Sequence, residues 1–532
     1  MGKIRKFETA NMNVTNMSRR KGEVMKQRGK IRDSLLLFSL FLFVVFLAGN
    51  GTIPSPAMAL DPILYVAWDA SAGGNGTSWG QAKQTIQEAV NAAAPGIEIW
   101  VKQGTYTLPA GSSSSTSEIL VNKVVQIYGG FNGTENLRAQ RDWKNNTTTV
   151  SGNGNNYVRG FHITADATID GFTITGGHLL SDSNIPTGAG ILIEANNAVI
   201  QNCIVTDNQS SITGGGITLK NPTNSSSIIN TWVSHNGSQY GVGGIVIESG
   251  SPKIVNCIIT QNTGENGGGI NCLLTSSPAI TNCTIYGNTR EPSGGSGVDC
   301  VGAAMVTNSI IWGNTPVGYP QITIGTGSTI SYCDIDQAGY ESGNYNIRLD
   351  PQFAYAAIGN FQLRTGSPCI NAGSNSAPQI VTPDLGGKLR IVDGTVDMGA
   401  YEYPLVDLGL GMIYSPDLHL TWLQDANYAR TSGYDADGAM TWVDAMTWAT
   451  NLNYNGVGGW RLPTYDPVNW KQCSNSKLNE MEWIRCNACG GHIDQNCPFI
   501  NLGGPDPPYD TYWSGTEDVL DPTNKAWYWM YG

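Results

Sequence analysis

Charged side chains are scarce in this sequence: Asp, Glu, Lys and Arg make up 14% of the 532 residues, and only five residues are His. Disordered chains usually combine high charge with low hydrophobicity, so a hydrophobic content of 40% argues against disorder. A His-Glu-x-x-His metalloprotease motif and a phosphate-binding loop are both absent. No cysteine precedes Cys203, which excludes a lipid-modified N-terminal cysteine. The sequence therefore gives no support for a metalloprotease or for a nucleotide-binding protein with a phosphate-binding loop.

Small and turn-forming residues are abundant instead. The chain contains 66 glycines together with many Asn, Ser and Thr residues, a composition that favours a turn-rich, mainly β fold. Its length exceeds that of one ordinary domain, so we expect two or three units.

The N-terminus has the features of an export signal. Ten Lys and Arg residues precede an apolar run from Leu35 to Ala48, and Ala57-Met58-Ala59 is a small-residue cleavage site. This order predicts a secretory signal peptide at residues 1–59 and a secreted or cell-surface protein. A retained N-terminal anchor is the alternative, although the run is short for a membrane span. The true start could also be Met17 or Met25.

Cleavage after Ala59 would change the net charge from −12 to −19, because the removed segment has ten basic and only three acidic residues. A strongly acidic surface disfavours nucleic acid and anionic polymers as partners. It is compatible with bound cations and with neutral glycans.

An internal repeat of about 26 residues fills the central half of the chain. Five seven-residue segments align without gaps, with first Asn residues 28, 26, 26 and 26 residues apart: Asn202–Asn208, Asn230–Asn236, Asn256–Asn262, Asn282–Asn288 and Asn308–Asn314. A second motif lies between them, at Gly190-Ile191, Gly216-Ile217, Gly244-Ile245, Gly269-Ile270 and Gly297-Val298. Each unit is too short to bury its own apolar face, so the units must stack.

Within each segment, the second and fourth positions are small or apolar, as in Cys257 and Ile259. A period of two indicates a strand whose alternate side chains face a narrow interior. Short strands recurring once per coil predict a parallel β-helix, with coils about 4.8 Å apart. We expect the flanking Asn residues to form amide ladders at the turns. We also expect the glycines before each second strand to supply turn conformations closed to other residues.

This region resembles the right-handed parallel β-helix repeat family of secreted bacterial proteins, a pectate-lyase-like solenoid. The segment Tyr65–Trp79, followed by an amphipathic stretch at Ala82–Ala94, resembles the cap that covers the first coil in that family. Ser367–Gly373 and Asp384–Tyr403 resemble its closing segment. The resemblance implies right-handed coils, which parallel crossovers also favour.

The cysteines form two groups. Cys203, Cys257, Cys283 and Cys333 share one repeat position, which predicts a buried stack of free thiols, with a Cys257–Cys283 disulfide as the alternative. Cys473, Cys486, Cys489 and Cys497 lie near the C-terminus. For these four, disulfides, a zinc site and free thiols all remain open.

The chain after Pro404 has a different composition, with nine of the 15 tryptophans at residues 422–529. A helix is expected after Thr441, whose pairing with Asp444 is typical of an N-cap. The ordered motifs Gly459–Thr464, Glu480–Ile484, Tyr512–Gly515 and Ala526–Trp529 resemble the domain-of-unknown-function family at the end of the Legionella collagen-like adhesin. This resemblance implies a small α+β, C-type-lectin-like fold. That family usually continues with another strand, so a truncated domain is also an expectation.

Catalytic residues are hard to find in the repeat. Galacturonan hydrolases of this fold carry Asn-Thr-Asp, Asp-Asp and Gly-His-Gly motifs, and none of these occurs. Pectate lyases use an arginine base near calcium-binding aspartates, whereas Arg290 is isolated here. Glu194 and Glu248 take matching places two coils apart, about 10 Å, which is wide for an inverting acid pair. We interpret both as solvated surface acids and predict no catalytic residue.

Candidate binding residues lie in the C-terminal region. Asp435 and Asp437 begin a sequence typical of a calcium loop but lack its distant Glu, so calcium and an ordinary Asp-Gly turn are both open. Trp513, Trp527 and Trp529 are the candidates for stacking on sugar rings, against the alternative that they pack in the core.

The sequence therefore predicts four parts: a signal peptide (1–59), an N-terminal cap with the first coils (60–160), the β-helix with its closing segment (161–403) and a C-terminal lectin-like domain (404–532). The main functional hypothesis is a non-catalytic surface or secreted protein that recognises extracellular or cell-surface glycans, or adheres to cells, with no membrane span after cleavage. A polysaccharide lyase or glycoside hydrolase acting in the β-helix groove is one alternative. A structural envelope protein is the other.

Overall fold

The computed structural model describes most of the chain after the predicted signal peptide. Described are residues 63–531 apart from 181–186, 222, 291–295, 317–319, 342, 417, 437–439, 465–479, 485–498, 500–509 and 518–525. The predicted signal peptide, Asp437 and the four C-terminal cysteines lie outside the described residues. Among the helices of the described part, none is long and apolar enough to cross a membrane.

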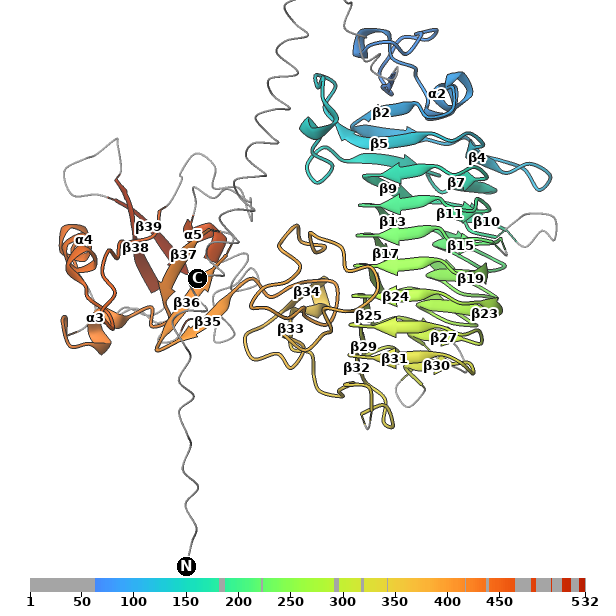
Figure 1. Ribbon diagram of the computed structural model, residues 1–532. Helices are drawn as coiled ribbons and strands as arrows, with labels where there is room; N and C mark the ends of the chain where they lie inside the picture. The colour runs from blue at the N-terminus through green and yellow to red at the C-terminus, as the bar shows by residue number, and fades with distance from the viewer. Residues whose placement is uncertain are drawn as a thin grey trace, which may run out of the picture. The chain divides into compact units, whose positions relative to one another are not determined.

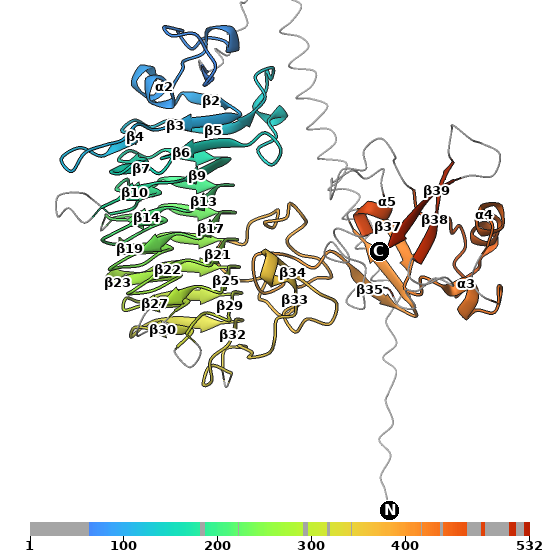
Figure 2. The ribbon, with the colours of Figure 1, turned by 180° about the vertical axis from the view of Figure 1, so that it is seen from behind.

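The central region is a parallel β-helix in which three long sheets run along the stacked coils (Figures 1 and 2). Sheet 1 contains β1 (Leu64–Val66), β2 (Glu98–Lys102), β5 (Gln126–Phe131), β8 (Thr168–Asp170), β12 (Val199–Gln201), β16 (Ser227–Ile229), β20 (Lys253–Val255), β24 (Ala279–Thr281), β28 (Met305–Thr307) and β31 (Thr329–Ser331). Sheet 2 contains β3 (Gly104–Thr107), β6 (Thr148–Ser151), β9 (Phe172–Thr175), β13 (Ile204–Thr206), β17 (Trp232–Ser234), β21 (Ile258–Thr260), β25 (Thr284–Tyr286), β29 (Ile310–Trp312) and β32 (Asp334–Ile335).

Sheet 3 has two rows of strands. The first row contains β4 (Ser117–Val121), β7 (Val158–Ile163), β11 (Ile191–Ile193), β15 (Ile217–Leu219), β19 (Ile245–Gly250), β23 (Ile270–Ser276), β27 (Val298–Cys300) and β30 (Ile322–Ile324). The second row contains the two-residue strands β10 (His178–Leu179), β14 (Gln209–Ser210), β18 (Gly237–Ser238), β22 (Thr263–Gly264) and β26 (Thr289–Arg290). From β4 to β32, eight coils each contribute one strand to the first row of sheet 3, then one to sheet 1 and one to sheet 2.

The strand registers confirm the stacking predicted from the repeat. Val205 pairs with Ile174 on one side and with Val233 on the other, and all three are fully buried. The fourth position of each segment therefore forms a continuous interior column, whose burial is the main source of stability.

The thiol stack is also confirmed, but its members are more than small hydrophobes. Cys203, Cys257, Cys283 and Cys333 are free and buried. Each Sγ lies within hydrogen-bonding distance of a backbone carbonyl two residues earlier, as in the 3.2 Å contact from Cys257 to Val255. Thr231 and Ser309 occupy the same column and donate their hydroxyls in the same way. The position therefore selects small side chains that can donate a hydrogen bond.

This pattern predicts that Cys257→Ser is tolerated better than Cys257→Val. Serine keeps a donor, as Thr231 and Ser309 do naturally, whereas valine removes it from a buried site. We expect the valine variant to be less stable than the serine variant by about 1 kcal/mol in urea unfolding. Equal stability of the two variants would show that the donor is unimportant.

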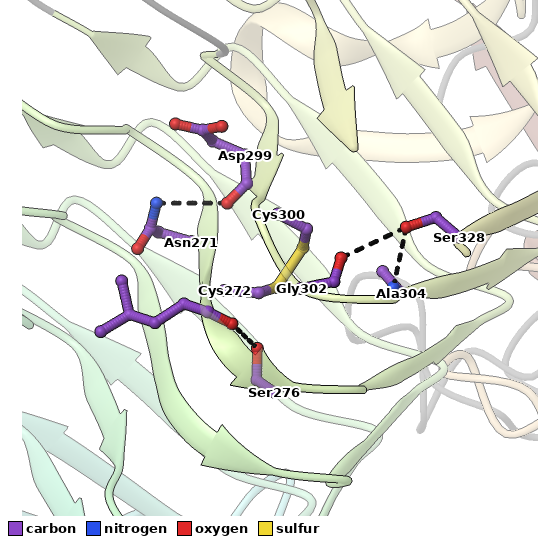
Figure 3. The surroundings of a disulfide bond; sticks show 9 residues. Asn271, Cys272, Ser276, Asp299, Cys300, Gly302, Ala304 and Ser328 are labelled. Atoms are coloured by element: carbon purple, nitrogen blue, oxygen red, sulfur yellow. Dashed lines mark hydrogen bonds between the residues drawn. A yellow bond between two sulfur atoms is a disulfide. The ribbon is translucent and has the colours of Figure 1, made fainter. Parts of the chain in front are cut away.

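One disulfide is present among the described residues, between Cys272 on β23 and Cys300 on β27 (Figure 3). The two residues are register partners on neighbouring coils, with Cα atoms 4.3 Å apart. The alternative Cys257–Cys283 bond is not formed. Neighbouring coils bring equivalent positions together in both places, as expected, but the disulfide forms in sheet 3 and not at the shared repeat position.

The expected role of the repeat glycines is wrong. Gly190, Gly216, Gly244, Gly269 and Gly297 do not have positive φ angles. They are needed because a Cβ at each would collide with backbone of the next coil; at Gly244 it would lie 2.3 Å from the carbonyl oxygen of Gly269. The constraint is therefore close approach between coils and not turn conformation.

Asparagine ladders are confirmed at the corner where each coil leaves sheet 2. The buried Asn208, Asn236, Asn262, Asn288 and Asn314 each donate Nδ2 to the next side-chain oxygen at 2.9 or 3.0 Å. The same Nδ2 atoms also donate to a backbone carbonyl of the preceding coil. The ladder thus satisfies polar groups that the corner would otherwise bury unpaired.

The first Asn of each segment has a different role. Asn202, Asn230, Asn256, Asn282 and Asn308 take left-handed conformations, with φ between 47° and 53°. Three of them donate to the closing segment: Asn256 to Pro383, Asn282 to Asp397 and Asn308 to Ser374. The amide ladder predicted for this row is therefore wrong in the main: only two long contacts of 3.5 Å join its members, Asn230 to Asn202 and Asn308 to Asn282.

The cap and the closing segment complete the solenoid. Helix α2 (Ile86–Ala92) has a Thr85–Glu88 capping box and buries Ile86, Ala89 and Val90 in the main core. The closing segment, with β33 (Phe353–Tyr355) and β34 (Asn360–Leu363), packs its aromatic residues on the outer face of the later coils of sheet 2. The outer face of sheet 2 is therefore covered in the later coils.

The C-terminal region contains a small α+β arrangement. The antiparallel strands β35 (Val406–Gly409), β36 (Met412–Ser415) and β37 (Leu420–Leu423) precede α3 (Tyr428–Thr431), α4 (Trp442–Asn451) and α5 (Glu480–Trp483), and β38 (Asp510–Glu517) pairs with β39 (Ala526–Tyr531). Thr441 caps α4 as predicted. Arg461 forms a two-pronged ion pair with Glu480, which joins two of the sequence motifs.

Candidate functional site

A polar groove lies over the second row of sheet 3, along β10, β14, β18 and β22. Figure 2 labels three of these strands, β10, β14 and β22. Its volume is about 420 Å³. The lining consists of His178, Gln209, Ser210, Ser211, His235, Asn236, Gly237, Ser238, Gln239, Gln261 and Thr263. Because these residues come from four consecutive coils, the groove spans about 14 Å along the solenoid.

The floor of the groove is rigid. Asn236 belongs to the buried amide ladder, and its backbone N–H and Nδ2 both donate to the Asn262 side chain at 3.0 Å. Gly237 has no side chain to fill the space, and a Cβ there would lie 2.1 Å from Oε1 of Gln209. The glycine therefore allows the Gln209 amide to lie over the neighbouring coil.

One wall of the groove is formed by corner residues that directly precede the ladder asparagines. The residue before each ladder asparagine is left-handed in every coil: glycine in the later coils (Gly287, Gly313) but Asp207, His235 and Gln261 in the middle three, with φ of 54° or 55°. A left-handed conformation costs a non-glycine residue roughly 1 kcal/mol or more. His235 and Gln261 are nevertheless exposed there and line the groove.

The groove offers hydrogen bonds without fixed charge. Its side chains are amides, hydroxyls and two imidazoles, and no Asp, Glu, Lys or Arg is among the eleven lining residues. Amides, hydroxyls and neutral imidazoles both donate and accept hydrogen bonds. Glycoside hydrolysis by two carboxylates has no candidates within this lining.

A second polar cluster lies on the outer face of the first row. His162 on β7 contacts Glu118 of β4 through Nδ1 at 2.9 Å and Glu194, which follows β11, through Nε2 at 3.0 Å. Arg159, fully buried, pairs with Glu118 and donates to the carbonyls of Gly188 and Thr187. Glu194 is thus bonded to a histidine rather than only solvated, and Glu248 lies two coils away as predicted.

This cluster has a pH signature. Burial opposes the charge of His162, but hydrogen bonds to Glu118 and Glu194 outweigh it and raise the pKa of the imidazole. Burial would raise the pKa of Glu118, yet the His162 hydrogen bond and the Arg159 charge hold that pKa below its ordinary value. The Glu118 carboxylate and the protonated His162 imidazole therefore stabilise each other's charged forms.

A pH dependence follows for the difference in melting temperature between the wild type and His162→Gln. The raised histidine pKa contributes stability that is complete below about pH 6.5 and is lost as the pH rises through the folded-state value. The lowered Glu118 pKa contributes stability that is lost as the pH falls through its own folded value. We expect the difference to be largest near pH 6 and to shrink on both sides. A difference that does not vary with pH would contradict this electrostatic account.

The binding residues predicted from the sequence lie in the C-terminal region and are not among the residues that line the groove. Trp513 lies on β38, paired with Tyr528, while Trp527 and Trp529 lie on β39. Asp435 follows α3 and is half-buried, whereas Asp437 lies outside the described residues. Within the described part, no group of three or more His, Cys, Asp or Glu side chains is arranged to hold a metal ion.

Sequence reasoning missed the groove residues although a signal was present. In the aligned repeat, the position before the last asparagine changes from Asp207, His235 and Gln261 to Gly287 and Gly313. The change marks three of the four coils that line the groove; the fourth, which contributes His178, has Gly176 at this corner. By contrast, the Glu118–His162 contact joins coils in which the repeat motif is weak or absent, so the alignment gave no sign of it.

Comparison with known proteins agrees on the fold. A family model described as "Right handed beta helix region" matches residues 136–289. Together with the coils above, this match shows a right-handed parallel β-helix. No curated protein matches the chain.

Two solved structures are similar in architecture. The pectate lyase Pel9A has 16% identity and a TM-score of 0.40, with 64% of this chain and 96% of that one covered. A rhamnogalacturonan lyase has 13% identity and a TM-score of 0.24, covering 55% and 90%. At these TM-scores the likeness carries no argument about chemistry, which must come from the residues.

Proposed function

We propose that the β-helix binds a polysaccharide chain in the polar groove over β10, β14, β18 and β22. The observation that carries the proposal is the set of exposed, left-handed His235 and Gln261 side chains, where the later coils use glycine. Backbone strain of this kind is retained at functional sites when the side chain has a task.

The chemistry of the groove suits a sugar polymer. Sugar hydroxyls donate and accept hydrogen bonds, and the amides, hydroxyls and imidazoles of the lining do the same. The groove extends over four coils, so an elongated ligand can contact equivalent positions on successive coils. Its volume of about 420 Å³ lies within the usual range for ligand sites.

This proposal moves glycan recognition from the C-terminal region to the solenoid. The lectin-like head, with Trp513, Trp527 and Trp529, and a calcium site at Asp435 and Asp437 remain separate predictions. Export through residues 1–59 also remains a proposal. A polysaccharide ligand is consistent with export, and N-terminal sequencing of protein from the culture medium would test it.

Replacing His235 by glycine tests the groove directly. We expect His235→Gly to weaken polysaccharide binding about tenfold, because hydrogen-bonding atoms are lost. Stability should stay the same or rise by up to about 1 kcal/mol, because glycine relieves the left-handed conformation. Affinity electrophoresis and thermal unfolding measure the two effects. Unchanged binding in this variant and in Gln261→Gly would contradict the proposal.

A second candidate function, a polysaccharide lyase, is favoured by the two imidazoles in the groove. A neutral imidazole can take the proton from the sugar carbon next to a carboxylate. The bond from the neighbouring carbon to the glycosidic oxygen then breaks and a carbon–carbon double bond forms. The leaving oxygen takes a proton from water or from the imidazolium. Histidine is the side chain that most often serves in general acid–base catalysis as a whole. Release of unsaturated, ultraviolet-absorbing products from uronate polymers, lost in His178→Ala or His235→Ala, would support cleavage.

A further inference from the structure

We infer that the ligand of the groove is an uncharged glycan and that one of its sugar rings stacks on Tyr240. This inference rests on the proposed function, because it names the chemical class of ligand for the same groove. It uses two observations outside the lining: an exposed aromatic side chain at the rim and the sign of the flanking charges.

Tyr240 is held at the rim of the groove. It follows the lining residue Gln239, whose Nε2 donates to the Tyr240 hydroxyl at 3.0 Å. Asn266 of the next coil donates to the Tyr240 carbonyl at 2.6 Å, which fixes the backbone. The Tyr240 side chain is nevertheless 56% exposed. A fixed, exposed aromatic ring beside hydrogen-bonding groups provides an apolar face together with a polar edge.

The exposed charges that flank the lining residues are negative. Asp207 occupies the same corner row as His235, one coil earlier, and is exposed. Glu265 is exposed beside Asn266. Arg290 is engaged by the Asp299 carboxylate at 3.0 Å and by the Glu265 carbonyl. A uronate or sulfated polymer would therefore meet carboxylates at the rim and no fixed cation in the lining.

The apolar faces of pyranose rings match the exposed Tyr240 ring, and the ring hydroxyls match Gln239, Gln209 and His235. An uncharged glycan can stack on the ring and form these hydrogen bonds without repulsion from the carboxylates of Asp207 and Glu265. The inference therefore separates this groove from one built for polyuronates.

The test measures binding of the full chain to soluble neutral glucans, galactomannan and polygalacturonate by affinity electrophoresis at neutral pH. We expect a neutral polymer to bind and polygalacturonate not to bind. Tyr240→Ala should weaken that binding about tenfold, whereas Tyr240→Phe, which keeps the ring, should stay within about threefold. Tyr434→Ala is the matched control, because Tyr434 is a comparably exposed tyrosine in the C-terminal region.

The outcomes are distinguishable. Binding of polygalacturonate alone, reduced in His235→Gly, would support the proposed function and overturn the neutral ligand. Neutral binding that is lost in Tyr434→Ala but kept in Tyr240→Ala would overturn the Tyr240 platform and favour the C-terminal region. Absence of binding to every polymer would overturn the proposed function itself.

Discussion

Asn236→Ala is expected to lower the free energy of unfolding by about 3 to 5 kcal/mol, because several buried polar groups lose their partners together. The Asn236 Nδ2 donates to the Val205 carbonyl at 2.9 Å and to the Asn262 side chain. Its Oδ1 accepts from the backbone and side chain of Asn208. Chemical unfolding followed by circular dichroism measures the loss.

The matched control is Asn91→Ala, which removes an exposed asparagine from helix α2. Its side chain accepts from Gln87 at the surface, so we expect a change below about 1 kcal/mol. A similar loss of stability in both variants would show that the buried ladder contributes no more to stability than an exposed asparagine does. Because Asn236 also lines the groove floor, the ladder variant should lose polysaccharide binding as well.

Gly244→Ala is the second substitution with a large expected effect. The new Cβ would lie 2.3 Å from the Gly269 carbonyl oxygen, which is backbone and cannot rotate away. Separating the two coils would disturb their hydrogen bonds, so we expect a loss of about 2 to 3 kcal/mol. Thermal unfolding of the purified variant measures it.

Gly80→Ala is the control for this prediction. Gly80 also lacks a positive φ, but nothing lies within 4 Å of the place that its Cβ would take, so alanine should fit. We expect its melting temperature to stay at the wild-type value or rise slightly. An equally stable Gly244→Ala variant would show that the coils can separate at low cost.

The repeat was sufficient to predict the β-helix because its signal is geometric. Side chains that alternate with a period of two, in units too short to fold alone, leave stacking as the only way to bury Val205, Val233 and Ile259. The same logic predicted the amide ladder of the last asparagines and the buried free thiols. It holds wherever one coil repeats the next.

Contacts that the repeat does not encode could not be predicted. The sequence shows that Gly244 recurs, but not whether a turn conformation or a neighbouring carbonyl requires glycine. The Cys272–Cys300 bond is an exception, because each cysteine lies two residues after the second motif, at Ile270 and Val298, so the alignment could have paired them. The cluster of Arg159, Glu118 and His162 joins coils whose motif is weak or absent.

The candidate site was only partly visible in the sequence. His235 and Gln261 stand out in the alignment once the equivalent position is known to be left-handed, because glycine is the residue expected there. Tyr240 and Gln209 do not deviate from the repeat in this way. Their importance depends on which side chains of neighbouring coils lie together, which the alignment does not show. Trp513 and its neighbours were chosen by composition, which indicates a domain with an aromatic core as readily as a binding face.

The most direct test of the central claim is hydrogen–deuterium exchange of the full chain with and without a binding oligosaccharide. If the groove binds the ligand, protection should concentrate in peptides covering 174–180, 205–211, 233–240 and 259–264, and should disappear in His235→Gly. Protection confined to residues 404–532, with these peptides unchanged, would contradict the account and place recognition in the C-terminal region.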